Sequence, residues 1–372
     1  MPVRTPFFEV KLEGEDITPW VETVTVVEDD RQADSVVIDI PDPRMIYTDA
    51  LFEGSEAEID LGYADANQHA LMLRAVITKV ELNYPQGGVP LLKLRGEDRS
   101  IYMGLEEKRK LWRNMKVSEI VQAIARPYGF SRVVAEPDPD PLIEQRPLNQ
   151  DGKTDLAFLQ ELATDYHAKC FVELDEKGQE VLYFIPERRV LRARRADRLL
   201  LRYRLGPNSN LISFSPSFDS SYIDRLKEIH DVDEQGNPVE SQDRPATEVV
   251  IWPLDPARMA QANSRDRAKI QTLYTLGVAR KLKLQTQLAS RQPAVGAVTP
   301  DQADLESRND RLESRQLGMS ANGSTTGNIW LRAKSNIIVE GVSERFNGEW
   351  YVNNVTHKVD NNGYRTDFQC VR

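Results

Sequence analysis

Histidine and cysteine are the side chains in this sequence best suited to metal binding or nucleophilic chemistry, and both are scarce. The 372 residues include four histidines, at positions His69, His167, His230 and His357. None of them has the short spacing to cysteine or to another histidine that a metal site requires. Cys170 and Cys370 are too few and too far apart for a disulfide framework, which is typical of a reducing compartment. We therefore expect no metal site and no cofactor.

A carboxylate pair is the remaining candidate for catalysis. Asp138 and Asp140 stand two residues apart in "EPDPDP", and two carboxylates facing each other across a cleft are what glycoside hydrolysis needs. The flanking prolines instead favour an extended connector. The sequence also lacks a G-x-S-x-G nucleophile elbow and a G-x-x-x-x-G-K-[ST] phosphate loop. We expect no catalytic residue and no enzyme activity.

Length, charge and hydropathy limit the class of protein. A chain of 372 residues predicts two to four domains. The net charge of −10 argues against broad nucleic-acid binding, which depends on a surplus of Lys and Arg. The N-terminus lacks the apolar run of a secretion signal, and no segment approaches the ~20 apolar residues of a membrane helix. We expect synthesis in the cytoplasm and no membrane insertion.

Residues 1–104 are predicted to form a β-barrel-like domain. In "VETVTVVE" the residues Val24 and Val26 alternate with polar neighbours, and in "EAEIDLGY" the apolar side chains fall on every second position. This period of two is typical of half-buried strands. Two longer strands are joined at Gly87-Gly88, a dipeptide that favours a hairpin.

Residues 105–205 are predicted to form an α+β domain. "KVSEIVQAIARPYGF" has helical spacing, with Ser118 as the expected N-cap. "TDLAFLQELATDYH" predicts a second helix, capped by Thr154. Its expected buried stripe is Leu156, Leu159, Leu162, Ala163 and Tyr166. Two strands, joined by a turn at Gly178, follow.

A second barrel-like domain is expected from residues 206–253 and 327–372, interrupted by a helical and polar insertion over 254–326. Asp255-Pro256 favours a helix start. Near the C-terminus, Asn347-Gly348 and the run from Asp360 to Gly363 predict hairpin turns. The residues expected to share inward faces of these strands are Tyr351, Val355 and Val359, then Tyr364, Thr366, Phe368 and Cys370. His357, in the same alternation, is expected to be packed or hydrogen-bonded rather than catalytic. The fold class is therefore α+β, mainly β.

The C-terminal strands resemble the phage late control D family, the baseplate hub proteins of contractile phage tails, related to the base of the valine-glycine-repeat spike proteins of type VI secretion. The residues carrying this resemblance include the fold signature Gly341, Phe346, Gly348, Tyr351, Gly363, Tyr364, Thr366 and Phe368, with His357 among them. Four upstream segments fit the same family in the same order. They are "FEGSEAEIDLGYAD" with the long strand pair after it, "NMKVSEIVQAIARPYGF", "NQDGKTDLAFLQELATDYHAKCFVELD" and "LISFSPSFD".

The resemblance implies a homotrimer in which each chain contributes two barrel-like tube domains. Three chains would then form a ring with pseudo-sixfold symmetry, joining a sixfold inner tube to a threefold central spike. It also implies baseplate wedge components as partners, and a separate spike protein, because the chain ends at Arg372 without a spike blade. The particle could be a phage tail or an extracellular contractile injection system.

The basic stretch near residue 194 predicts either contact with an anionic partner or a solvated, charge-balancing surface. If the chain forms a trimer, this stretch and the polar insertion are the candidate contact regions. The candidate interface residues are Arg188, Arg192, Arg194, Arg195, Arg308 and Arg311.

Two alternatives to a structural hub remain at this point. One is a peptidoglycan hydrolase carried by such a particle, using Asp138 or Asp140. The other is a carbohydrate-binding module in which Trp330, Trp350 and Tyr351 stack on sugars, although strand positions favour core packing for at least two of them.

Overall fold

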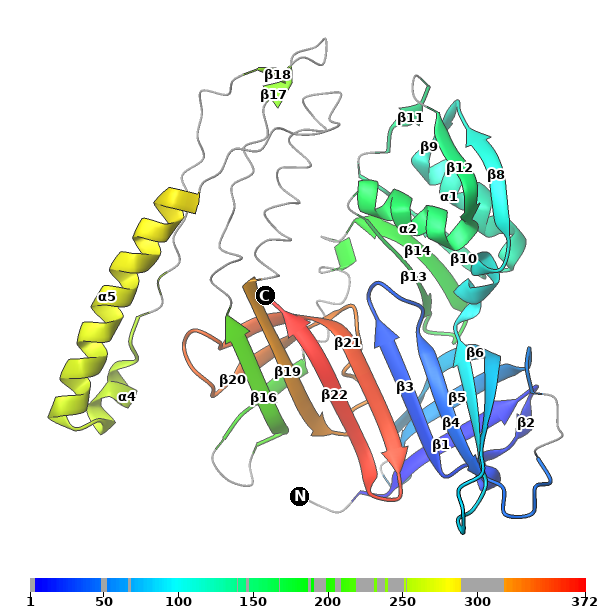
Figure 1. The fold of residues 1–372 in the computed structure, drawn as a ribbon, viewed down its shortest axis with the longest axis horizontal. Coiled ribbons are helices and arrows are strands. Elements are labelled where there is room, and N and C mark those ends of the chain that lie inside the picture. The colour runs from blue at the N-terminus through cyan, green and yellow to red at the C-terminus, as the bar shows by residue number, and fades with distance from the viewer. Residues whose placement is uncertain are drawn as a thin grey trace.

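The structure is a computed structural model. It describes residues 4–47, 52–65, 68–138, 140–144, 147–166, 168–186, 189–190, 199–204, 209–218, 231–232, 238–239, 251, 253–288 and 318–372. Figure 1 shows sheets in the centre and lower right, a smaller unit of helices and strands above them, and one long helix to the left. The predicted fold class, α+β and mainly β, is confirmed.

The first β unit is an antiparallel sheet built by the N-terminal part of the chain. Its strands are β1 (Pro6–Leu12), β2 (Glu15–Asp16), β3 (Thr23–Asp29), β4 (Ser35–Pro41), β5 (Glu56–Tyr63), β6 (Gln68–Asn83) and β7 (Leu91–Glu97). They pair in the order β3-β4-β7-β6-β5-β1-β2. The predicted hairpin at Gly87-Gly88 is confirmed, because it joins β6 to β7 and Gly88 donates its backbone N–H to the Pro85 carbonyl.

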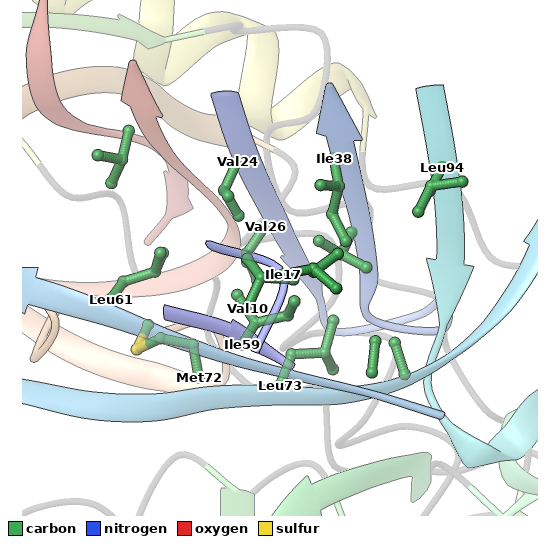
Figure 2. Packing of buried hydrophobic residues seen from close by; sticks show 14 of the residues in the cluster. Val10, Ile17, Val24, Val26, Ile38, Ile59, Leu61, Met72, Leu73 and Leu94 are labelled. Atoms are coloured by element: carbon green, nitrogen blue, oxygen red, sulfur yellow. The ribbon is translucent and has the colours of Figure 1, made fainter. Parts of the chain in front are cut away.

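The core of this unit confirms the alternation predicted from sequence. Val24 and Val26 of β3 and Ala57, Ile59 and Leu61 of β5 are buried. Figure 2 shows Val10, Val24, Ile38, Ile59 and Leu94 pointing into one cluster from different strands. Each such aliphatic side chain contributes roughly 1.5–3 kcal/mol by leaving water.

The α+β unit follows. Its elements are β8 (Glu107–Trp112), β9 (Met115–Lys116), α1 (Val117–Ala125), β10 (Arg132–Ala135), β11 (Leu142–Ile143), β12 (Leu148–Thr154), α2 (Asp155–Asp165), β13 (Ala168–Leu174) and β14 (Glu180–Pro186). β10, β14 and β13 form a three-stranded sheet, and both helices contribute to its hydrophobic core.

One of the two predicted helix caps in this unit is right. Thr154 caps α2, since its hydroxyl accepts the Ala157 N–H at 3.2 Å. The predicted Ser118 cap of α1 is wrong. Lys116 occupies the N-cap position and donates its backbone N–H to Glu119, while Ser118 lies in the first turn and bonds to Asp140. In α2 the buried stripe includes Phe158, which the prediction omitted, with Leu159, Leu162 and Ala163; Leu156 and Tyr166 are only partly buried.

The second β unit is formed by β15 (Leu199–Arg202), β16 (Leu211–Phe218), β19 (Met319–Thr326), β20 (Ser335–Glu340), β21 (Gly348–Asp360) and β22 (Gly363–Val371). A separate two-stranded pair consists of β17 (Asp231–Val232) and β18 (Pro238–Val239). Two placements made from sequence are wrong. Residues 319–326, assigned to the polar insertion, form β19 between β16 and β22. Residues 199–202, assigned to the α+β domain, pair with β20.

The hairpins near the C-terminus are partly as predicted. Asp360 pairs with Gly363 around a two-residue turn, as expected. Asn347-Gly348 is not a two-residue turn, because a seven-residue loop from Gly341 to Asn347 separates β20 from β21. In that loop the Asn347 side chain accepts the Val342 N–H at 3.1 Å, a contact that asparagine makes readily in turns.

A β-bulge in β21 overturns one predicted face. The register with β22 shifts between Val352 and Asn354. A bulge adds a residue to one strand and reverses the facing of what precedes it. Val352 and Val355 consequently share one core, whereas Tyr351 packs in a different cluster with Ile185. The prediction that Tyr351 shares a face with Val355 and Val359 is wrong.

The two β units form one continuous sheet. β21 pairs antiparallel with β3 over Asn354–Val359 and Val24–Asp29, so a C-terminal strand continues the N-terminal sheet. Val359 and Tyr364 from the second unit pack in the core of the first. The pairing fixes the orientation of one unit against the other.

The predicted helical insertion contains α4 (Pro256–Gln261) and α5 (Ser264–Leu288). The start at Asp255-Pro256 is confirmed, because the Asp255 carboxylate accepts the N–H groups of Ala257 and Arg258. No helix in the described ranges combines the length and hydropathy needed to cross a bilayer.

Candidate functional site: a buried charged junction

Three parts of the chain meet at a cluster of buried charges. Strand β3, the turn between β3 and β4, and the residue after β7 provide carboxylates from the first β unit. Strand β13 provides Lys169 and Glu173 from the α+β unit, and the segment before β20 provides Arg332 and Lys334. The carboxylates of the first β unit are Glu28, Asp30, Asp34 and Asp98.

The cations of this junction bridge units rather than neighbours in sequence. Lys334 Nζ lies 3.0 Å from both carboxylate oxygens of Asp34 and 3.8 Å from Glu173. Arg332 pairs with Glu28 and lies 3.3 Å from Glu173. Each of these two cations therefore holds the first β unit and the α+β unit together.

A third cation makes the same connection from the α+β side. Lys169 Nζ donates to Asp30 at 2.8 Å, and the Tyr351 hydroxyl donates to the same carboxylate oxygen at 3.2 Å. Tyr351 also packs with Ile185 and Val190. The junction thus combines ion pairs with an apolar contact.

The electrostatics of the junction keep Lys334 charged. Burial alone would lower its pKa, but the carboxylates of Asp34, Glu173 and Glu28 around it raise the pKa above the ordinary value. Burial raises the pKa of Asp98, even though Ser100 and the Asp34 N–H donate to its carboxylate. Five carboxylates thus surround three cations, and removing one cation would leave buried negative charge without compensation.

The backbone at the junction is also unusual. Lys334 has a φ of 62°, in the left-handed region that β-carbon-bearing residues seldom adopt. Its N–H donates to the Val352 carbonyl at 2.8 Å. This conformation costs about 1–2 kcal/mol.

His357 is packed and hydrogen-bonded, as predicted. It is fully buried on β21, and its Nδ1 lies 2.8 Å from the Tyr364 hydroxyl and 3.2 Å from the Thr366 hydroxyl. Burial, reinforced by the positive charge of Arg332, lowers its pKa to about 3. A neutral His357 ring protonated on Nε2 lets the Tyr364 hydroxyl donate a hydrogen bond to Nδ1. The ring therefore has a structural role.

Among the other residues considered for chemistry, His167 and His230 lie outside the described residues, while Asp140 and the two cysteines have structural positions. Asp140 accepts the backbone N–H and the hydroxyl of Ser118, at 2.9 and 2.7 Å. Cys370 is buried, and burial raises the pKa of Cys170 to about 12. Among the described residues, His, Cys, Asp and Glu side chains form no group of three or more that could hold a metal ion.

The three aromatic residues proposed as sugar platforms do not share a surface. Trp350 and Tyr351 are buried, as expected for core packing. Trp330 is 68% exposed and lines a cavity of about 470 Å³ with Tyr63 and Tyr364.

The predicted interface arginines Arg188, Arg192, Arg194, Arg195, Arg308 and Arg311 all lie outside the described residues. They stay predictions. The fold-signature residues, in contrast, all lie within the described part of the chain. Gly341 lies at φ +84° with the Tyr203 carbonyl against it, so a side chain there would clash. Phe368 covers Gly323, and Tyr364 covers Gly327.

The charged junction was not predicted from the sequence, although one signal pointed to it. Glu28 continues the inward alternation of Val24 and Val26, so a carboxylate occupies a core-facing position. A buried carboxylate needs a cation or donors. The identity of that cation, Arg332, more than 300 positions away, could not be inferred from local spacing.

Comparison with known proteins identifies solved structures that have a similar fold. No family model matches the chain, and no curated protein matches it in sequence. Among solved structures, the prophage MuSo2 43 kDa tail protein from Shewanella oneidensis is similar over 99% of this chain and 98% of its own, with a TM-score of 0.65 and 12% identity. The tail protein from Neisseria meningitidis MC58 is similar over 99% and 97%, with a TM-score of 0.63 and 12% identity.

A third similar structure comes from a secretion system. An Escherichia coli protein described as a component of the type VI secretion system, with structural similarity to bacteriophage T4 tail proteins, matches 97% of this chain and 76% of its own. Its TM-score is 0.59 and its identity 14%. The chain therefore shares its fold, over nearly its whole length, with phage tail proteins and a type VI secretion component.

Proposed function

We propose that this protein is a structural hub of a contractile tail-like baseplate. Three copies would form a ring that joins a sixfold inner tube to a threefold central spike. Support comes from the near-complete overlap with tail proteins and from the agreement of that fold with the motifs identified in the sequence. The expected partners are two further copies, an inner tube protein, a separate spike protein and baseplate wedge components.

The observation that carries the proposal is the pairing of β3 with β21. Because it joins the two β units into one sheet, each chain presents them as a fixed pair. Three fixed pairs in a ring supply six similar surfaces to a sixfold partner and three identical chains to a threefold partner. A chain whose two β units were flexibly linked would not present them in a fixed relative orientation.

Binding to both partners tests the proposal. The purified chain is mixed with a candidate tube protein and, separately, with a candidate spike protein from the same source, and the complexes are sized by light scattering. We expect one ring of three chains to bind a tube end and one trimeric spike. Failure to bind either partner as a trimer would contradict the proposal.

A further inference from the structure

Helix α5 presents an exposed face that the described part of its own chain does not cover. Arg265, Lys269, Leu273, Leu276 and Arg280 follow one another at intervals of three or four residues, so they lie on one side of the helix. All five are exposed, Leu273 by 68% and Leu276 by 50%. We call these five residues the α5 face.

The opposite side of α5 is turned towards the rest of its chain. Tyr274, Val278 and Lys281 are half-buried, and Lys281 Nζ lies 5.4 Å from the centre of the Phe218 ring on β16. Arg258 of α4 donates to the Val342 carbonyl, which ties α4 to the second β unit. The α5 face therefore points outward from an anchored helix.

A complementary surface lies on the first β unit. The first 65 residues contain seventeen acidic and four basic residues, whereas α5 contains six basic and one acidic residue. Glu15, Asp16 and Glu22 are exposed next to the 3-10 turn Thr18–Trp20. Asp16 accepts the Thr18 N–H at 2.9 Å, so the acidic edge and this turn are contiguous.

That acidic edge borders exposed apolar side chains. Trp20 stacks on Tyr47 at 4.5 Å between ring centroids, and the neighbouring Met45 and Ile46 are exposed by 55% and 60%. We call Glu15, Asp16, Glu22, Trp20, Met45 and Ile46 the acidic edge patch. It has apolar side chains flanked by carboxylates, and the α5 face has leucines flanked by cations.

The two surfaces cannot meet within one chain. In Figure 1 helix α5 stands at the left of the molecule, and β2, which carries Glu15 and Asp16, lies at the right-hand edge of the large sheet. A contact between them has to join two chains. Two different surfaces of the same chain make a head-to-tail contact, which closes into a ring when the rotation allows it.

We infer that the α5 face of one copy docks on the acidic edge patch of a second copy, head to tail, around the ring. This inference rests on the proposed hub function and assigns the surfaces that hold the hub together. Apolar contact between Leu273, Leu276 and the side chains of Trp20, Met45 and Ile46 supplies affinity, and the opposite charges set register and orientation.

Charge reversal on each surface, and on both, tests the inference in the full-length chain. We expect Lys269→Glu with Arg280→Glu to raise the dissociation constant of the trimer about tenfold or more, because like charges would then face each other. Glu15→Lys with Glu22→Lys should do the same. The chain carrying all four changes should regain the trimer, since opposite charges again meet at each contact.

The matched control is Arg132→Glu with Lys177→Glu, which makes the same charge change at exposed positions of the α+β unit. It should leave the trimer unaffected, and circular dichroism shows whether each variant is folded. Folded single-surface variants that remain trimers like the control would overturn the inference while leaving the hub function intact. A wild-type chain that is monomeric at every concentration would overturn both, and a monomer that uses the α5 face to bind tube protein would identify the tube as the occupant instead.

Discussion

Single residues in this protein matter most where charge is buried. Lys334, Arg332 and Lys169 each reach carboxylates from another part of the chain, and none of these pairs has more than slight contact with water. A buried pair adds little net free energy when it forms, because both ions lose hydration, but losing one partner is costly. The junction therefore makes the arrangement of the three units specific.

Removal of Lys334 should show that cost. Lys334→Met leaves Asp34 buried without its paired cation, and we expect the free energy of unfolding to fall by about 3–5 kcal/mol. Lys358→Met is the matched control. Its pair with Asp360 is half-exposed, so its loss should cost about 0–1 kcal/mol. Urea denaturation measures both, and equal effects would contradict a structural role for the junction.

His357 predicts a pH dependence with a definite sign. Its pKa in the folded protein is lowered to about 3, against ~6.5 in an unfolded chain. Between these values the unfolded chain binds a proton that the folded chain does not. The free energy of unfolding should therefore fall as the pH drops below about 6, by about 1.4 kcal/mol per pH unit from this group.

His357→Asn tests this dependence because the amide keeps a hydrogen-bonding group near Nδ1 but does not titrate. The slope of unfolding free energy against pH, measured by urea denaturation between pH 6 and 4, should be shallower than in the wild type by about one proton. His69→Asn controls for loss of an exposed imidazole. Parallel slopes for the wild type and His357→Asn would contradict the assignment.

At the level of secondary-structure elements, the strands were predicted from the sequence more accurately than the turns. Alternation in β3, β5 and β22 identified their buried faces, because a period of two fixes facing once a strand is regular. The bulge in β21 and the seven-residue loop before it depend on pairing with distant strands, so local residues did not reveal them. Strand β19, with "MSANGSTT", is small and polar, and its membership of the sheet comes from its neighbours β16 and β22.

Gly323 is the one glycine of β19, and its position explains why this strand needs a small residue there. The Phe368 ring of β22 lies directly over Gly323, so that a β-carbon there would come within 2.1 Å of the ring. We expect Gly323→Ala to lower the free energy of unfolding by about 1–3 kcal/mol through overpacking.

The control for this glycine is Gly104→Ala. The nearest atom to a β-carbon at Gly104 is Leu156 Cδ2 at 3.8 Å, an ordinary contact. A change that meets only ordinary contacts should alter stability by no more than about 0.5 kcal/mol. Thermal unfolding of both variants is the measurement, and equal midpoints would show that the aromatic cover of Gly323 is dispensable.

At the scale of the whole molecule, the central feature is the sharing of one sheet and part of one core by both β units. The fold could be anticipated from the sequence because five ordered motifs resemble one family. The surfaces that would bind other chains could not, since charge and exposure depend on which side of each helix or strand is covered.

Because the two β units share part of one core, we expect them to unfold together. Val359 lies on β21 of the second unit but packs in the core of the first. Val359→Ala should lower the free energy of unfolding by about 2 kcal/mol and increase amide exchange in β4 and β20 together. An increase confined to one β unit would show that the units open independently, which is incompatible with a fixed pair.

The mass of the wild-type protein in solution is the most direct test of the hub proposal, measured by light scattering over a range of concentrations. One chain has a mass of 42.3 kDa. We predict a species of three chains that persists on dilution into the micromolar range and binds one spike. A protein that remains a single chain at all concentrations, with and without the spike protein, would contradict the account.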